Sequence, residues 1–210
     1  MKKVEDKLKE KLNDKEFIAK SQCVIRLLMT RLEIINVELS MRLKRDVIQM
    51  KTGRLKSYKS ICKKLNKKGL EKSFSAAVEN IHDLIGVRGV CSYVDDIYLV
   101  QEMLEAQQDI NILKIKDYIK NPKESGYQSL HMILEIPLVF KGETQWIKTE
   151  LQLRTAAMDY WANLDHQLRY KKEDHRRHDA SIDQELKKCS EIVEYLDQTM
   201  LEVRKKIEKI

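Results

Sequence analysis

The chain has 210 residues but only six glycines and two prolines. Turn-rich β-architectures and long irregular loops use both residue types, so their scarcity, with 35% charged residues, favours long helices and short connections. No apolar run approaches the ~20 residues of a membrane span. The N-terminus, MKKVEDKLKEKLNDKEF, has no apolar signal core. We therefore expect a soluble, cytoplasmic protein with no membrane partner.

The four cysteines lie far apart, show no metal-ligand spacing, and each falls within an apolar or helical stretch. This pattern predicts buried free thiols in a reducing compartment at Cys23, Cys62, Cys91 and Cys189. The sequence also lacks G-x-x-x-x-G-K-[ST], which excludes a P-loop.

Positive charge is concentrated near the N-terminus: residues 1–72 carry a net charge of roughly +12, and the remainder roughly −5, by a count along the sequence. A basic segment suits a polyanionic partner, either nucleic acid or nucleotide phosphates. For any single lysine, a solvated helix face explains the charge equally simply.

Hydrophobic spacing predicts both helices and strands along the chain. We expect helices at residues 17–50, 54–69, 75–80, 97–108, 155–171 and 181–210. We expect strands at residues 83–94, 110–118, 127–140 and 144–155. This order predicts an α+β fold with a mixed sheet of four or five strands flanked by helices.

The last two strands are joined by the turn KGET and should pair as a hairpin. Because strand side chains alternate between faces, their polar residues should gather on one surface. These residues are Tyr127, Ser129, His131, Lys148, Glu150, Gln152 and Arg154. One solvated side of a sheet would also explain the alternation, but this set is richer in chemistry than solvation requires.

Further polar residues belong to the neighbouring strands: Asp83 and Arg88 in the first, and Asp117 and Tyr118 at the end of the second. Carboxylates near each other on adjacent strands can hold Mg²⁺, which takes one or two of them and fills its other positions with phosphate oxygens and water. Surrounding Arg and Lys would bind phosphates. The constellation indicates phosphoryl-type transfer.

Five segments resemble, in order, the motifs of the RelA/SpoT-type alarmone synthetases, and specifically of their single-domain members, the small alarmone synthetases. The segments are TGRLKSYKSICKKL (52–65), HDLIGVRGVCSYVDDIYLV (82–100), KDYIKNPKESGYQSLH (116–131), ELQLRT (150–155) and YWANLDHQLRYK (160–171). The resemblance covers roughly residues 50–172, more than half of the chain.

The resemblance implies a nucleotidyltransferase-like fold and a pyrophosphokinase that uses Mg²⁺ to transfer the β,γ-pyrophosphate of ATP to the 3′-OH of GDP or GTP. GMP stays open as an acceptor, because Glu124 places a negative charge in the expected phosphate loop. The separate hydrolase domain of larger members has no counterpart here, so we expect synthesis only. Two alternatives are a toxin-like relative that modifies adenine nucleotides or tRNA 3′ ends, and an RNA-binding module with an inactive nucleotide site.

On the ATP side, the resemblance implies that Arg54 and Arg88 sandwich the adenine, as guanidinium planes do well. Lys56, Ser60 and Lys64 match phosphate ligands. Their spacing of four would place them on one face of the helix expected at 54–69.

At the reaction centre, the resemblance implies Asp83 as the Mg²⁺ ligand and Glu150 as a carboxylate that assists the metal and accepts the 3′-OH proton. Tyr127 matches the tyrosine that stacks on guanine. Further matches on the acceptor and phosphate side are Lys123, His131 and Gln152. Candidates for phosphate contact or for orienting other groups are Lys148, Arg154, Ser129 and His166.

The resemblance divides the chain into an N-terminal helical extension (1–50), the synthetase domain (51–172) and a C-terminal helix (173–210). The terminal helices carry more apolar surface than one small sheet can cover. We expect them to assemble a homo-oligomer, with a tetramer ahead of a dimer. Single-stranded RNA is a candidate regulator.

Overall fold

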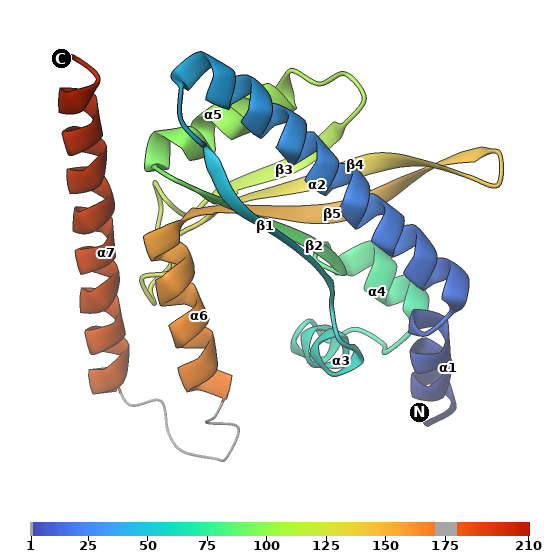
Figure 1. Ribbon diagram of the computed structural model, residues 1–210. Helices are drawn as coiled ribbons and strands as arrows, with labels where there is room; N and C mark the ends of the chain where they lie inside the picture. Colours follow the sequence, from blue (N-terminus) through green and yellow to red (C-terminus); the bar gives the residue numbers. More distant parts are fainter. Residues whose placement is uncertain (1, 171–179) are drawn as a thin grey trace.

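A mixed five-stranded sheet is the centre of the computed structural model, which describes residues 2–170 and 180–210 (Figure 1). The strand order is β1-β2-β5-β4-β3, with β2 and β5 parallel and the other neighbours antiparallel. The strands are β1 (Ile48–Leu55), β2 (Ile85–Cys91), β3 (Asn111–Asp117), β4 (Leu130–Phe140) and β5 (Glu143–Thr155). The predicted α+β fold is confirmed.

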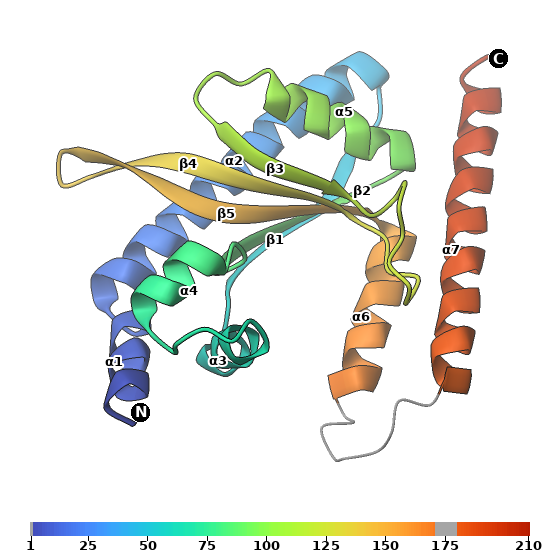
Figure 2. The ribbon, with the colours of Figure 1, turned by 180° about the vertical axis from the view of Figure 1, so that it is seen from behind.

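Helices cover both faces of this sheet. They are α1 (Lys2–Leu12), α2 (Lys15–Leu43), α3 (Tyr58–Lys67), α4 (Phe74–Asn80), α5 (Val94–Glu105), α6 (Ala156–Tyr170) and α7 (Ala180–Ile207). Helices α2 and α5 lie against one face, α6 lies at the other face, where Asp159 pairs with Arg88 and Arg154, and α3 and α4 lie beside the sheet next to α1 (Figures 1 and 2). None of the helices in residues 2–170 and 180–210 is long and apolar enough to cross a membrane.

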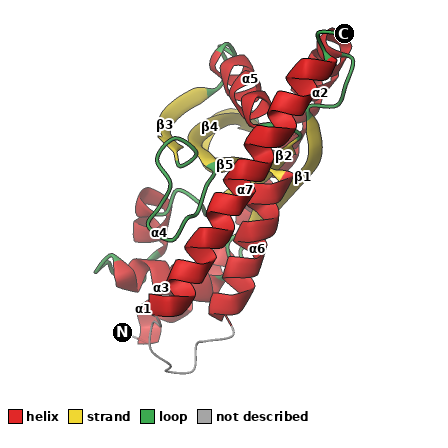
Figure 3. Cartoon of the chain, turned by 90° about the vertical axis from the view of Figure 1, so that its left-hand side faces the viewer, coloured by secondary structure: helices red, strands yellow, loops and turns green. Residues whose placement is uncertain are grey.

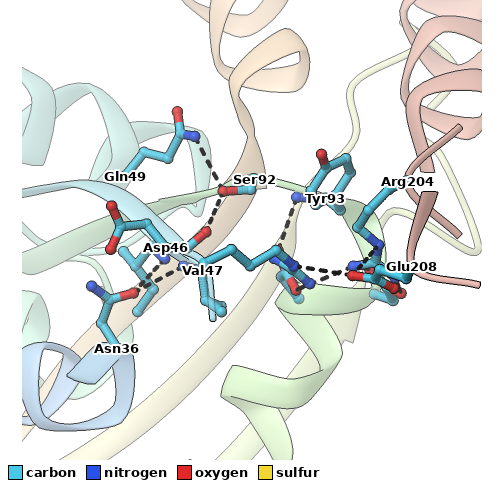
Figure 4. A network of polar contacts seen from close by, with 12 residues as sticks. Asn36, Asp46, Val47, Gln49, Ser92, Tyr93, Arg204 and Glu208 are labelled. Atoms are coloured by element: carbon cyan, nitrogen blue, oxygen red, sulfur yellow. Dashed lines mark hydrogen bonds and ion pairs between the residues drawn. The ribbon is translucent and has the colours of Figure 1, made fainter. Parts of the chain in front are cut away.

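Strand β1 corrects the expectation of one helix over residues 17–50. Helix α2 ends at Leu43, because Lys44 adopts a left-handed conformation with φ 54°. Asn36 on α2 then accepts hydrogen bonds from the backbone N–H groups of Val47 and Ile48 and fixes the start of β1 (Figure 4). The expected boundary at residue 50 falls inside this strand.

The main core lies between the sheet and α2. The buried stripe of α2 consists of Val24, Leu28, Leu32, Ile35 and Leu39, at most 1% exposed, and these side chains share one cluster with the apolar faces of β4 and β5. Removing this much apolar surface from water is the main stabilising contribution to the fold. Helix α2 is thus part of the body that holds the sheet.

A second cluster joins α1, α3 and α4 beside the sheet. Its buried members are Leu8, Ile61, Leu65, Ala77, Ile81 and Leu84. Ser57 begins α3, because its hydroxyl accepts the backbone N–H of Ser60 at 3.4 Å. The cluster fixes α3 against the turn that leads into β2.

Helix α7 runs beside α6 (Figure 3), and the Trp161 indole N–H of α6 donates to the Leu186 carbonyl at 3.0 Å. The connection between these helices, and with it the expected boundary at residue 172, lies outside the described residues. All four cysteines are free thiols as expected, but only Cys91 is buried and Cys189 is exposed.

A charged cluster attaches the end of α7 to the body (Figure 4). Arg45 donates two hydrogen bonds to the fully buried Asp96, at 2.7 and 2.8 Å. Arg204 donates to Asp95 at 2.5 and 3.1 Å. Both guanidinium groups lie within 5.0 Å of the Tyr93 ring centroid.

We expect Asp96→Ala to lower the free energy of unfolding by about 3–5 kcal/mol, because it leaves Arg45 partly buried without its partner. Urea denaturation followed by circular dichroism measures the change. Asp95→Ala is the matched control: the Asp95 carboxylate is 35% exposed, and Arg204 keeps Asp96 and Glu208 within 3.8 Å, so we expect a loss of about 1 kcal/mol or less. Equal losses in the two variants would contradict this account of the cluster.

Candidate active site

The predicted polar face of the β4–β5 hairpin is confirmed. A two-residue turn at Lys141 and Gly142, both with positive φ, joins the strands. The register places His131 opposite Gln152, and the parallel neighbour β2 places Arg88 beside Gln152. Apolar partners such as Leu130 opposite Leu153 share the other face and are buried.

Asp83 lies in the turn just before β2, two residues ahead of the strand in which we expected it. Both carboxylate oxygens accept a lysine: Lys56 Nζ lies 2.6 Å from Oδ2 and Lys64 Nζ 2.8 Å from Oδ1. Partial burial opposes ionisation of Asp83, but the two ammonium groups outweigh it and hold its pKa below the ordinary value. Asp83 is therefore a charged carboxylate at neutral pH.

We expected Lys56, Ser60 and Lys64 to share one face of a helix, and this prediction is wrong. Lys56 precedes the N-cap of α3, so only Ser60 and Lys64 lie on this helix. The two lysines nevertheless converge, because Asp83 receives both of them. Ser60 is exposed in the first turn of α3, and its hydroxyl accepts that of Ser57 at 2.9 Å.

Glu150 is the second carboxylate of the site, and it is buried. Its Oε1 lies 3.2 Å from His131 Nδ1, and its Oε2 accepts Gln152 Nε2 at 2.6 Å. Burial opposes its charge, but His131 and Gln152 outweigh this effect and lower the pKa of Glu150. A carboxylate held in this way is a hydrogen-bond acceptor ready for a substrate proton.

A chain of hydrogen bonds extends from Glu150 to Arg154. The Tyr127 hydroxyl lies 2.7 Å from His131 Nε2, and Arg154 Nη2 donates to that hydroxyl at 2.5 Å. A neutral His131 protonated at Nδ1 satisfies every member: Arg154 donates to Tyr127, Tyr127 to His131, and His131 to Glu150. The chain fixes the imidazole ring and the Tyr127 ring relative to the carboxylate.

Residues 118–129 form a loop before β4, which we call the Tyr127 loop. Tyr127 and Ser129 belong to it and not to the expected strand, since β4 begins at Leu130. The ammonium group of Lys123 lies 4.6 Å from the Tyr127 ring centroid and 4.5 Å from that of Tyr118. A cation and two aromatic faces suit a planar ring that carries phosphates.

Arg154 is 4% exposed, and its guanidinium nitrogens all donate hydrogen bonds to neighbouring side chains. It therefore orients these side chains. Its Nη1 donates to Asp159 on α6 at 3.1 Å, and Arg88 Nη1 reaches the same carboxylate at 2.8 Å. Asn163, one helical turn further, accepts from Arg88 at 3.1 Å. The i, i+4 spacing of Asp159 and Asn163 in the sequence could have indicated this pair, but its polar partners lie on distant strands.

A cavity of about 280 Å³ brings the two carboxylates, Asp83 and Glu150, together. It is lined by Arg54, Asp83, Arg88, Glu150, Gln152 and Asn163, among others. Arg54 faces Gly86 across the β1–β2 pair, which makes Arg54 and Arg88 diagonal neighbours about 7–8 Å apart on one face. Two long side chains that start this far apart on one face can extend on either side of one planar ring. Gly86 adds no side chain to that space.

Of the predicted site residues, only Arg54, Asp83, Arg88, Glu150 and Gln152 are among those that line this cavity; Lys56, Lys64 and His131 reach it through Asp83 and Glu150. The Ser129 hydroxyl is buried and donates to the Leu153 carbonyl at 3.1 Å, so it anchors the Tyr127 loop to β5. Lys148 lines a separate apolar cavity of about 580 Å³ beside Phe17 and Trp146. His166 is exposed on α6. Neither Lys148 nor His166 is among the lining residues of the smaller cavity.

Two ionised carboxylates, lysines that reach one of them, and arginines spaced for a planar ring define a nucleotide-dependent transferase of the phosphoryl-transfer class. Residues 53–175 match the family model described as the region found in RelA / SpoT proteins. More than half of the chain lies within this match, and the chain therefore belongs to the RelA/SpoT family and, within it, to the small alarmone synthetases.

Individual relatives match most of the chain. GTP pyrophosphokinase YwaC of Bacillus subtilis is 40% identical over 181 residues, which are 85% of this chain and 84% of that protein. The structure of small alarmone synthetase 1 from Bacillus subtilis bound to its product pppGpp has a TM-score of 0.82 at 31% identity, covering 91% and 96% of the two chains. The same synthetase bound to AMPCPP gives a TM-score of 0.77 at 29% identity, covering 93% and 97%.

Proposed function

We propose that this protein is a GTP pyrophosphokinase, which transfers the β,γ-pyrophosphate of ATP to the 3′-OH of GDP or GTP. The observation that carries the proposal is the single cavity lined by both Asp83 and Glu150, with lysines at one carboxylate and the Tyr127 loop beside the other. The printed names of the relatives support it: one is a GTP pyrophosphokinase, and another was solved with its product pppGpp.

The donor would bind between β1, β2 and α3. Arg54 and Arg88 are spaced for the adenine ring, and Lys56 and Lys64 are placed for its phosphates. AMPCPP in the relative occupies a protein of the same fold. In the free protein, Lys56 and Lys64 pair with Asp83. When ATP binds, the two lysines would exchange this carboxylate for the phosphates of ATP.

The acceptor would bind at the Tyr127 loop. Tyr127 and Tyr118 offer ring faces to a purine, and Lys123 offers a cation to its phosphates. Lys116, next to His131 in the β3–β4 register, adds another cation that sequence reasoning missed. GMP remains a candidate acceptor beside GDP and GTP.

A divalent cation accompanies phosphoryl-type transfer in general, and we propose Mg²⁺ here. No group of three or more metal-ligating side chains occurs in the part of the chain that the structure describes. Asp83 and Glu150 supply two carboxylates at one cavity, which is the number that Mg²⁺ takes when phosphates complete its shell. The cation would neutralise charge that develops on the phosphates.

In the reaction, the acceptor 3′-oxygen forms a bond to the β-phosphorus of ATP, and the bond from that phosphorus to the α–β bridging oxygen breaks. AMP leaves with the bridging oxygen. The proton of the 3′-OH passes to the Glu150 carboxylate, whose position His131 and Gln152 hold. Lys56 and Lys64 hold the pyrophosphate in line.

The test is transfer of label from γ-labelled ATP to GDP, GTP, GMP and AMP with Mg²⁺, resolved by chromatography. We expect labelled product on GDP or GTP and no loss of pyrophosphate from purified pppGpp. No transfer to any mononucleotide by folded protein would reject the proposal, and the same assay with tRNA would then test the toxin-like alternative.

We propose further that the protein forms homo-oligomers, with a tetramer ahead of a dimer, through its terminal helices. The outer side of α7 exposes large apolar side chains that the monomer leaves uncovered: Ile192, Tyr195, Leu196, Met200 and Val203. Light scattering coupled to size exclusion measures the mass. We also propose single-stranded RNA as a regulator, because residues 1–72 carry a basic charge. A cytoplasmic location is a further proposal, supported by the nucleotide substrates.

A further inference from the structure

Helix α7 contacts the Tyr127 loop directly, at the two residues that flank Tyr127 in the sequence. The Ser190 hydroxyl donates to the Gly126 carbonyl, and Gln128 Nε2 donates to Glu194 Oε2 at 3.1 Å. Ser190 is 4% exposed, so its bond to Gly126 is shielded from water. Gln128 is 5% exposed but Glu194 is exposed, so the second bond is buried on the side of the loop only.

Gly126 makes this approach of loop and helix feasible. Its φ is +85°, a conformation that favours glycine, and a Cβ at this position would lie 2.7 Å from the Ser190 Cβ. Inside the loop, the Gly126 N–H donates to the Lys123 carbonyl at 2.7 Å, and the Lys123 N–H donates to the Tyr127 carbonyl at 3.2 Å. These bonds connect the backbone of Lys123 and Tyr127 to Gly126, which in turn contacts α7.

The body-facing side of α7 is one stripe. Ser190, Glu194, Asp197, Leu201 and Arg204 follow each other at intervals of four and three, the spacing of one helical face. Asp197 accepts the buried Thr155 hydroxyl at 2.6 Å where β5 ends. The same stripe thus extends from the Tyr127 loop to the charged cluster at Asp95. Contacts at both ends fix the position of α7 along its own axis.

We propose that Ser190 and Glu194 are positioning residues for the acceptor: α7 holds the backbone of the Tyr127 loop, while Arg154 and His131 hold the Tyr127 hydroxyl. This inference rests on the proposed pyrophosphokinase activity. Because the donor groups lie on β1, β2 and α3, loss of the α7 contacts should affect the acceptor and spare ATP.

The experiment measures KM for GDP and for ATP separately in Ser190→Ala and Glu194→Ala. We expect each variant to raise the KM for GDP about 2- to 10-fold, as loss of one net hydrogen bond does, with the KM for ATP within about twofold of wild type. Glu194→Gln keeps an oxygen that accepts Gln128 and should restore the wild-type value. Glu191→Ala, on an exposed side of the same helix, is the matched control.

An unchanged KM for GDP in both Ala variants would overturn the inference, as would equal increases for GDP and ATP. Glu194 is exposed, so Glu194→Ala tests the idea even if Ser190→Ala folds poorly. A wild-type protein without any transfer would reject the proposed function itself, which is a different outcome.

Discussion

Replacing Asp83 by asparagine is expected to reduce kcat for pyrophosphate transfer about 10³-fold or more, equivalent to the several kcal/mol that a bound cation contributes. The amide has the shape of the carboxylate but no charge to hold Mg²⁺. It also removes the anion that engages Lys56 and Lys64 in the free protein. Both lysines would then meet ATP without having to leave Asp83.

Binding of ATP without metal provides the discriminating measurement. In EDTA, calorimetry should show Asp83→Asn binding ATP as tightly as wild type or tighter, although its activity with Mg²⁺ is lost. Asp109→Asn is the control, because that exposed carboxylate pairs with Arg31 away from the cavity. If Asp83→Asn lost ATP binding in EDTA, the carboxylate would have a structural role, contrary to our account.

Replacing Glu150 by glutamine is expected to lower kcat about 10²- to 10⁴-fold, the range for loss of a positioned general base. The amide can keep one contact with His131, so we expect KM for both substrates to stay within about threefold. Steady-state transfer assays with varied ATP and varied GDP measure both parameters. Glu143→Gln, on the same strand but exposed at the hairpin turn, should be unaffected.

The pH dependence follows from the pKa of Glu150, which, against the opposing effect of burial, His131 and Gln152 hold below the ordinary value of a glutamate; that ordinary value is about 4.3 in peptides. A lowered pKa keeps the carboxylate charged, so Glu150 is fully ionised at neutral pH and accepts a proton only as pH falls below that ordinary value. The acid limb of kcat that belongs to Glu150 should therefore lie below about pH 4.3. A limb that vanishes in Glu150→Gln but lies near pH 6 would contradict this assignment.

Sequence periodicity predicted the hairpin and its two faces correctly, because both strands are long and each marks one face clearly. Strand β4 has an apolar residue at every second position from Leu130 to Leu138, and β5 has a polar residue at every second position from Lys148 to Arg154. Strand β1 was missed for a physical reason. It is an edge strand with one neighbour, and most of its side chains are exposed, so no apolar alternation marks it. Leu39, Leu43 and Val47 meanwhile continue the helical period of α2 across the true helix end.

The site was predicted in part. Asp83, Glu150 and the two lysines do come together, although Lys56 reaches Asp83 from before the helix and not from its face. The positions of Asp159 and Ser190 could not be predicted, because each depends on a partner that only the tertiary packing of α6 or α7 supplies. Periodicity predicts which side chains share one face of a helix or strand. It does not predict which side chains from distant parts of the sequence contact that face.

The parallel pairing of β2 with β5 joins two stretches of the chain that are otherwise separate. Every group assigned to contact ATP lies within residues 54–88, and every group assigned to contact the acceptor lies within residues 116–152, which Ser190 and Glu194 support from α7. Mutations that alter the choice of acceptor can therefore accumulate in one continuous segment, while recognition of ATP is inherited unchanged from the other. This division gives a lineage of such enzymes a simple route to new acceptors, and a chimera that exchanges residues 116–152 between relatives would carry acceptor preference with it.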